Sequence, residues 1–178
     1  MKIVIITGSP RKHGNSSCLA DEFQRGAIEA GHEVFRFNAA FQKVESCIAC
    51  NHCGMNGDCV QKDDFALLRP QLIDADVVVF ATPIYYYGFS AQLKKVIDRF
   101  YAINGILQGQ NKKAVLLVSY ASTSIQDADY IIDHYRGLIR FLGWENEGEV
   151  VAKGVWDAAV VKQTEFPEKA YLLGKSIA

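Results

Sequence analysis

The sequence predicts an α/β fold in which helices cover both faces of a five-stranded parallel sheet. Continuous apolar runs of strand length occur at 3–6, 77–81 and 114–118, as in strands that are buried on both faces. Two other strand-like stretches, 34–37 and 147–151, are diluted by charge or glycine, as at the edges of a sheet. Helix-like segments separate these stretches, so we expect parallel strands joined by right-handed crossovers.

Helices are expected at 17–30, 63–74, 91–101 and 128–142, with a further helix from Pro167 onward. The fourth has one apolar stripe, formed at spacings of three and four by Ile131, Ile132, Tyr135, Leu138, Ile139 and Leu142. The order 2-1-3-4-5 satisfies this pattern, with the apolar strands inside and the diluted ones at the edges. That is the flavodoxin-like order, in which ligands bind beyond the carboxyl ends of the strands.

Length and charge narrow the class of protein. The chain has 178 residues, of which 49% are hydrophobic, so we expect a single domain over 1–178 with one core. A net charge of -1 gives no electrostatic footprint for nucleic acid or an anionic membrane, and small-molecule partners are expected. The amino terminus has neither a signal-peptide nor a membrane-span pattern, which predicts a cytoplasmic protein.

The loop after the first strand has the features of a phosphate site. It ends in a helix amino terminus, where unpaired N–H groups and the helix dipole attract anions. Neither GxxxxGK[ST] nor GxGxxG occurs in the chain, so a monophosphate is expected rather than a triphosphate or dinucleotide. The candidate donors are Ser9, Arg11, Asn15, Ser16 and Ser17.

The loops after the third and fourth strands supply the remaining candidate binding residues. Adjacent tyrosines beside proline and glycine offer flat faces to a planar heteroaromatic ring, although they could instead pack on neighbouring helices or a second subunit. The small, hydroxyl-rich loop after the fourth strand would leave one face of such a ring open, or would simply be a serine-rich turn. These candidates are Pro83, Ile84, Tyr85, Tyr86, Tyr87 and Gly88 in the first loop, and Ser119, Tyr120 and Ser122 in the second.

Two stretches, GSPRKHGNSS after the first strand and TPIYYYGFSAQLKKVIDR after the third, resemble the NAD(P)H-dependent FMN reductase and iron-sulfur flavoprotein branch of the flavodoxin superfamily. The resemblance covers nearly the whole chain. It implies that the serine-rich loop holds the FMN phosphate, that residues 83–88 line the isoalloxazine and that 119–122 complete the pocket. No catalytic acid, base or nucleophile is then expected from the protein, because the flavin itself carries the hydride or electrons.

Four cysteines crowd one insertion at about 45–61, here called the cysteine segment. Cys47, Cys50, Cys53 and Cys59 have the spacing C-x2-C-x2-C-x5-C, which can surround one tetrahedral sulfur site. The spacing resembles the compact motif that holds a four-iron four-sulfur cluster in iron-sulfur flavoproteins. Zinc and unligated thiols remain alternatives, because the spacing permits all three states.

Three functions follow from these expectations. In the leading one, NAD(P)H reduces bound FMN, which then reduces a small acceptor such as free flavin or a quinone. In the second, a ferredoxin-like donor feeds a cluster that feeds FMN, and in the third a non-catalytic flavin-binding module contacts a partner through Tyr85 to Tyr87. We expect a homodimer or homotetramer. Asp98 and Arg99 are interpreted as a solvated helix end.

Overall fold

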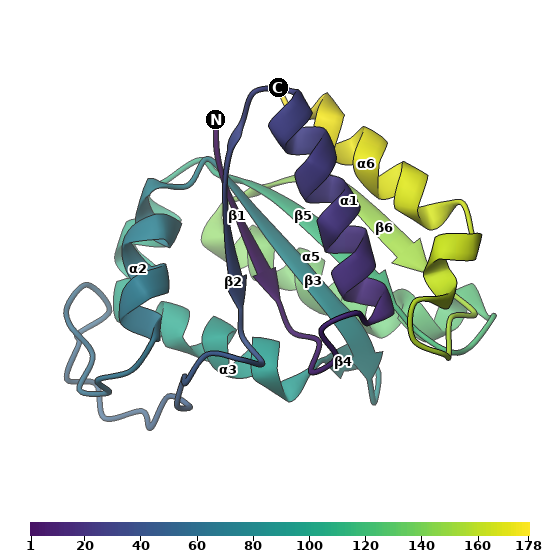
Figure 1. Ribbon diagram of the computed structural model, residues 1–178. Coiled ribbons are helices and arrows are strands. Elements are labelled where there is room, and N and C mark those ends of the chain that lie inside the picture. Colours follow the sequence, from purple (N-terminus) through teal and green to yellow (C-terminus); the bar gives the residue numbers. More distant parts are fainter.

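The computed structural model describes all residues, 1–178, and contains the predicted parallel sheet with helices on both faces (Figure 1). The strands are β1 (Lys2–Thr7), β2 (Glu33–Asn38), β3 (Val77–Tyr85), β4 (Gly88–Phe89), β5 (Lys113–Ser119) and β6 (Glu145–Ala152). The α-helices are α1 (Asn15–Glu29), α2 (Phe65–Asp74), α3 (Ala91–Asp98), α4 (Asn104–Gln108), α5 (Asp129–Leu142) and α6 (Phe166–Ser176). Short 3-10 helices are η1 (Arg99–Ile103), η2 (Ile125–Ala128) and η3 (Val160–Gln163).

The strand order confirms the prediction. The parallel strands run β2-β1-β3-β5-β6, which is 2-1-3-4-5 once the two-residue β4 is set aside. The sequence did not reveal β4: β3 continues to Tyr85, through residues expected to be a loop, and β4 returns antiparallel to it. The carboxyl ends of β1, β3, β5 and β6 therefore meet at the lower edge of Figure 1, where this hairpin also projects.

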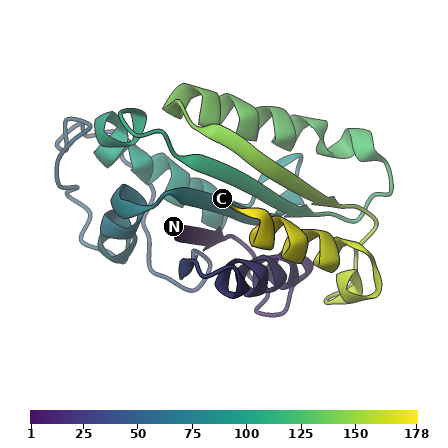
Figure 2. The same ribbon diagram turned by 90° about the horizontal axis from the view of Figure 1, so that it is seen from above.

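The helices form two layers around the sheet (Figure 2). On one face α1 and α6 lie side by side over a cluster of 18 buried apolar residues. On the other face α2, α3 and α5 cover a cluster of 28, to which the predicted stripe of α5 contributes Ile131, Tyr135, Ile139 and Leu142. Continuous burial of β1, β3 and β5 explains why those strands read as unbroken apolar runs.

One expectation about the helices was wrong. The segment predicted as a single helix over 91–101 ends at Asp98, and Arg99 begins η1 rather than a solvated end. The Arg99 side chain is only 2% exposed because it pairs with Asp63, at Nη1 to Oδ2 2.6 Å. A guanidinium can be buried in this way only when its charge and most of its N–H groups find partners.

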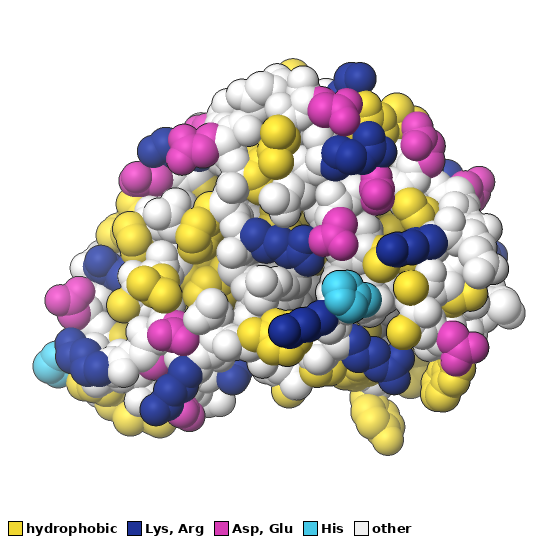
Figure 3. Space-filling model, viewed as in Figure 1, with side chains coloured by type: hydrophobic (Ala, Val, Ile, Leu, Met, Phe, Trp, Pro, Cys, Tyr) yellow, Lys and Arg dark blue, Asp and Glu magenta, His cyan; other side chains and the backbone are white.

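Acidic and basic side chains alternate over the face made by α1 and α6, in keeping with the near-zero net charge (Figure 3). At the lower edge of the same view one apolar side chain stands clear of the surface, where Figure 1 has the β3–β4 turn. None of the helices combines the length and the apolar character that crossing a bilayer requires.

Candidate functional site

A cavity of about 200 Å³ opens at the carboxyl edge of the sheet, where flavodoxin-like folds bind their ligands. The carboxyl end of β3 and the segments that follow β1, β5 and β6 all contribute to it. Its lining consists of Ser9, Arg11, Gly14, Asn15, Ser16, Pro83, Ile84, Tyr85, Ser119, Tyr120, Ala121, Val155 and Trp156. The structure thus brings together nine of the predicted binding residues: Ser9, Arg11, Asn15, Ser16, Pro83, Ile84, Tyr85, Ser119 and Tyr120.

The loop after β1 is shaped by its own hydrogen bonds. Ser9 Oγ accepts from the Arg11 N–H at 3.2 Å and lies 3.1 Å from the Arg11 carbonyl, to which Ser17 Oγ also donates at 3.3 Å. A Cβ at Gly14 would lie 2.7 Å from Ser9 Oγ, so this turn requires glycine. Ser17 therefore supports the loop from outside the cavity and is not among the residues that line it.

The amino end of α1 opens into the cavity without a cap. Its N-cap residue, Gly14, has no side chain to accept from the first-turn N–H groups, which the helix itself leaves unpaired. Ser16 is 1% exposed, and its hydroxyl makes no hydrogen bond within the protein. Arg11 is exposed and takes part in no ion pair. The start of α1 thus offers unpaired N–H groups, a free hydroxyl and a free guanidinium, which are the kinds of group that bind anions.

Asn15 lines the cavity, but its amide group is occupied. Nδ2 donates to the carbonyls of Val155 at 3.0 Å and Asp157 at 2.9 Å, and Oδ1 accepts from the Val161 N–H at 3.2 Å. All these partners lie in the segment after β6. The side chain predicted to donate to a phosphate thus ties the start of α1 to that segment.

The tyrosine turn joins β3 to β4 with unusual backbone angles. Tyr86 and Tyr87 have φ of 47° and 63°, in the left-handed region that favours glycine and asparagine. Only Tyr85 lines the cavity; Tyr86 is 102% exposed, and Tyr87 packs edge-on against Tyr130 with ring centroids 5.3 Å apart. Of the predicted residues 83–88, the structure brings the first three to the cavity and leaves Tyr86, Tyr87 and Gly88 outside it.

Buried hydrogen bonds join the loop after β1 to the end of β3 and the start of α3. Ser90, which is fully buried, donates from Oγ to the Gly8 carbonyl at 2.8 Å and caps α3 through the Leu93 N–H. Its own N–H donates to Thr82 Oγ1 at 3.1 Å. A Cβ at Gly8 would lie 2.4 Å from Ser90 Oγ, so these two segments of the chain approach as closely as glycine allows. The loop after β1, the end of β3 and the start of α3 are therefore joined by hydrogen bonds.

The loop after β5 supplies the opposite wall. Ser119 and Tyr120 are 4% and 7% exposed, and the Tyr120 hydroxyl donates to the Ser124 carbonyl at 3.0 Å. Burial raises the pKa of Tyr120, so it stays protonated. Ser122 lies outside the cavity, where its Oγ accepts from the Ser124 N–H and its carbonyl accepts from Gly154. It holds the turn together.

Sequence reasoning missed the segment after β6. Val155 and Trp156 line the cavity, and neither was predicted to do so, whereas Ala121 lies within the predicted range 119–122. A signal for this segment did exist, since β6 belongs to the same parallel sheet and its carboxyl end must reach the same edge. A tryptophan that is 75% exposed just beyond that end marks the place.

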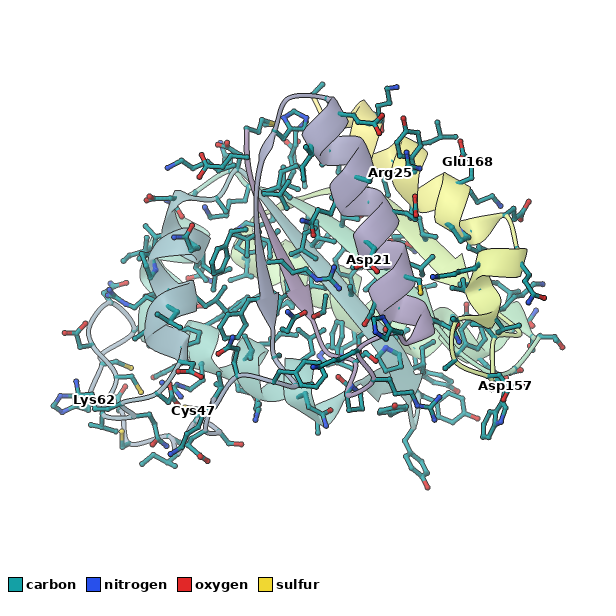
Figure 4. The ribbon with its side chains drawn as sticks, in the orientation of Figure 1. Asp21, Arg25, Cys47, Lys62, Asp157 and Glu168 are labelled. Carbon is teal, nitrogen blue, oxygen red and sulfur yellow. The ribbon has the colours of Figure 1, made fainter.

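The cysteine segment lies apart from the cavity. Figure 4 shows Cys47 and Lys62 on one side of the molecule and Asp157, next to the cavity, on the other. Nowhere do three or more His, Cys, Asp or Glu side chains converge in a geometry that would hold a metal ion. In this conformation the four predicted ligands, Cys47, Cys50, Cys53 and Cys59, are free thiols that do not form a common site.

Hydrogen bonds close the base of the cysteine segment. Lys43 and Asp64 are joined twice, by Lys43 N–H to Oδ2 at 2.7 Å and by Asp64 N–H to the Lys43 carbonyl at 2.9 Å. Asp63 Oδ2 accepts from the Glu45 N–H at 2.9 Å, and Arg99 donates to the Glu45 carbonyl at 2.9 Å. The chain therefore leaves and re-enters the fold at nearly the same point.

The fold and the cavity together define a flavodoxin-like protein in which an uncapped helix amino terminus lies beside aromatic side chains in one cavity. Residues 1–141 match the family model described as NADPH-dependent FMN reductase. The chain belongs to that family: it is an NAD(P)H-dependent oxidoreductase whose cofactor is FMN.

Relatives of known name agree with this assignment. An iron-sulfur flavoprotein of Archaeoglobus fulgidus is 32% identical over 180 residues, which cover 100% of this chain and 79% of that protein. An FMN-dependent NADH:quinone oxidoreductase of Trichlorobacter lovleyi is 30% identical over 90% of this chain and 89% of its own length. The match to an iron-sulfur flavoprotein of Methanocaldococcus jannaschii is 35% identical but spans 63% of this chain and 58% of that protein.

Solved structures share the fold at low sequence identity. An NAD(P)H:quinone oxidoreductase from Methanothermobacter marburgensis superimposes with a TM-score of 0.77 at 19% identity, over 100% of this chain and 99% of that one. An FMN-dependent NADH-azoreductase from Bacillus anthracis, solved with FMN, superimposes with a TM-score of 0.68 at 17% identity. The match covers 97% of this chain and 99% of that one. These likenesses place the β2-β1-β3-β5-β6 sheet among flavodoxin-like folds.

Proposed function

We propose that this protein passes electrons from NAD(P)H, through FMN held in the cavity, to a small diffusible acceptor such as a quinone or free flavin. The observation that carries the proposal is the meeting, in one cavity, of the uncapped amino end of α1 with the aromatic side chains of Tyr85, Tyr120 and Trp156. A phosphate needs the first of these features and a flavin ring needs the second.

The residues present fit the cofactor. The Ser16 hydroxyl, the Arg11 guanidinium and the N–H groups at the start of α1 would hold the phosphate, with Ser9 and Ser17 keeping the loop in shape. A volume of about 200 Å³ is smaller than typical cofactor pockets of about 300–1,000 Å³. Part of the flavin ring would therefore extend over the rim, where a second small molecule can reach it.

When bound, FMN supplies the hydride and electron chemistry, so the protein's task is to bind and orient it. Small acceptors are favoured because the site is a shallow opening rather than a tunnel. The names of the Trichlorobacter relative and the Methanothermobacter structure, both quinone oxidoreductases, support a quinone.

The test reverses the charge of the anion site. The double variant Arg11→Glu, Ser16→Asp places two carboxylates against the phosphate, and we expect FMN affinity to fall at least about a hundredfold, given ~1.4 kcal/mol per factor of ten and a strong like-charge penalty. Riboflavin, which has no phosphate, should bind with little change. The matched control is Lys175→Glu, on the exposed side of α6.

Titration by flavin fluorescence measures both affinities, and NADPH oxidation with a soluble quinone measures turnover. Undiminished FMN binding by the double variant would refute the phosphate site. Wild-type protein that binds FMN and oxidises NADPH but leaves quinones and free flavins unreduced would refute the proposed acceptor.

A second candidate is electron transfer through an iron-sulfur cluster, supported by the name of the Archaeoglobus relative and by the four-cysteine spacing. The thiols do not converge in this structure, so the cysteine segment would have to rearrange around the metal. Iron and sulfide analysis of anaerobically prepared protein tests it. Cys50→Ser should abolish iron binding while the control Cys18→Ser, in the buried part of α1, should not; iron-free wild-type protein would eliminate the candidate.

A further inference from the structure

Trp156 combines a fixed main chain with a free side chain. It lines the cavity, yet its side chain is 75% exposed. By contrast Trp144, the chain's other tryptophan, is 5% exposed and donates from Nε1 to the Leu107 carbonyl at 3.0 Å. At the rim of a cavity an exposed tryptophan side chain offers a large, flat, apolar face that a planar ligand in the cavity can cover.

The main chain on both sides of Trp156 is held by Asn15. The Asn15 Nδ2 donates to the carbonyl just before the tryptophan, that of Val155 at 3.0 Å, and to the one just after it, that of Asp157 at 2.9 Å. The Val161 N–H adds a third bond to Oδ1 at 3.2 Å. These bonds are largely buried, so they are stronger than the same bonds in water.

A second attachment comes from the loop after β5. The N–H of Val155 donates to the Tyr120 carbonyl at 2.9 Å, and Gly154 N–H donates to the Ser122 carbonyl at 2.7 Å. Trp156 is therefore anchored both to the phosphate loop, through the first residue of α1, and to the wall that carries Tyr120. Its indole is preorganised at the rim, and binding against it requires little ordering of the main chain.

We propose that Trp156 is the aromatic wall on which the flavin ring stacks, and that Asn15 is its positioning residue. The inference rests on the proposed function, since it takes FMN to be the occupant of the cavity. It assigns Asn15 a role through the tryptophan rather than through the phosphate. Covering one side of the ring with indole leaves the other side for the nicotinamide and the acceptor.

The first experiment removes the stacking surface. Trp156→Ala should weaken binding of both FMN and riboflavin, each about tenfold, because the lost contact is to the ring that the two molecules share. Trp156→Phe, which keeps a flat ring, should recover most of the affinity. The fluorescence of bound flavin, which stacking on indole quenches, should rise in Trp156→Ala. Phe141→Ala is the matched control, an exposed aromatic on α5 that does not line the cavity.

The second experiment separates positioning from phosphate binding. If Asn15 acts through Trp156, Asn15→Ala should lower the affinities for FMN and for riboflavin by the same factor. The double variant Asn15→Ala, Trp156→Ala should then be little weaker than Trp156→Ala alone, because both changes remove one interaction. If Asn15 instead binds the phosphate, Asn15→Ala lowers the affinity for FMN alone, and the fold-losses of the two substitutions multiply in the double variant. That result would overturn the positioning role of Asn15.

The outcomes distinguish this inference from the function on which it rests. Wild-type protein that binds no FMN defeats the proposed function. Wild-type protein that binds FMN, with Trp156→Ala equal to it in affinity and in bound-flavin fluorescence, defeats only the stacking role. A Trp156→Ala variant that changes its sedimentation but not its flavin binding would likewise overturn the inference, in favour of a subunit contact. Folding is not at risk in this variant, because the side chain is mostly exposed.

Discussion

The buried pair of Asp63 and Arg99 is one of the interactions that hold the base of the cysteine segment. Their side chains are 3% and 2% exposed, and Asp63 also accepts from the N–H groups of Glu45 and Phe65. Burial by itself would raise the pKa of Asp63, but the Arg99 guanidinium and these backbone N–H groups outweigh it and hold the pKa below its ordinary value. Asp63 is therefore a carboxylate whose charge the structure requires.

Replacing this carboxylate tests its role. Asp63→Asn leaves a buried guanidinium unpaired, and we expect the free energy of unfolding to fall by about 3–5 kcal/mol. Urea denaturation measures it. The matched control, Asp98→Asn, breaks the exposed pair with Lys94 and should cost no more than about 0.5 kcal/mol. Equal effects of the two changes would contradict the importance of burial.

The same pair predicts a dependence on pH. The pKa of Asp63 is lower in the folded state than its ordinary 3.8, so the unfolded chain takes up the proton first as the pH falls. The pair's contribution to the free energy of unfolding is complete above the ordinary pKa. It is lost as the pH falls through the pKa that Asp63 has in the folded protein. Asp63→Asn should therefore lose less stability than the wild type over this acid range.

The positions of single residues were predicted where neighbours in sequence determine them and not where distant partners do. Ser9, Arg11 and Ser16 were predicted together because they lie in one continuous stretch, and all three line the cavity. The prediction of a solvated Arg99 was wrong because its partner, Asp63, lies 36 positions away and no sequence pattern links the two. Trp156 was missed for the related reason that a lone aromatic after an edge strand has no repeat to reveal it.

At the scale of elements, the tyrosine turn stands out for its strain. Its central residues, Tyr86 and Tyr87, adopt positive φ, as in the hairpin turns that normally contain Asn-Gly. The alternation of apolar runs and helical patterns predicted the main strands and helices, because buried parallel strands and amphipathic helices have distinct periods. It could not predict the extension of β3 or the short β4, whose residues pair only because the turn takes this unfavourable form.

Relieving the strain should stabilise the protein. Tyr86→Asn removes no contact, since the side chain is 102% exposed, and asparagine tolerates this conformation better. We expect the free energy of unfolding to rise by about 1 kcal/mol, measured by thermal unfolding. Tyr87→Asn should gain less, because it also loses the contact with Tyr130. A larger gain from Tyr87→Asn would show that the strain lies elsewhere.

On the scale of the whole molecule, α6 is joined to α1 by a close approach of backbones. A Cβ added at Gly26 would lie 2.1 Å from the Tyr171 carbonyl oxygen, and one added at Gly174 would lie 2.1 Å from that of Phe23. Each helix thus presents a glycine to the other's backbone. Because α6 lies beyond residues 1–141, this contact ties a segment outside the family match to α1, the helix whose amino end reaches the cavity.

Filling this contact should separate the two helices. Gly174→Ala places a methyl group against a carbonyl that cannot move aside, and we expect a loss of about 2–3 kcal/mol in the free energy of unfolding. Gly137→Ala, in α5, provides the control. It meets nothing within 4 Å, so the same substitution should stabilise that helix by about 1 kcal/mol. Calorimetry that found both variants stabilised would disprove the tight contact.

The closed base of the cysteine segment has a consequence for how this protein can change. Because Lys43 and Asp64 are already hydrogen-bonded neighbours, the number of residues between them can change without moving these two positions. Loop-closure entropy grows only by about 0.6 kcal/mol per doubling of length. We therefore expect the spacing of the thiols in the cysteine segment, and whatever those thiols bind, to tolerate change with little effect on the cavity on the other side of the molecule.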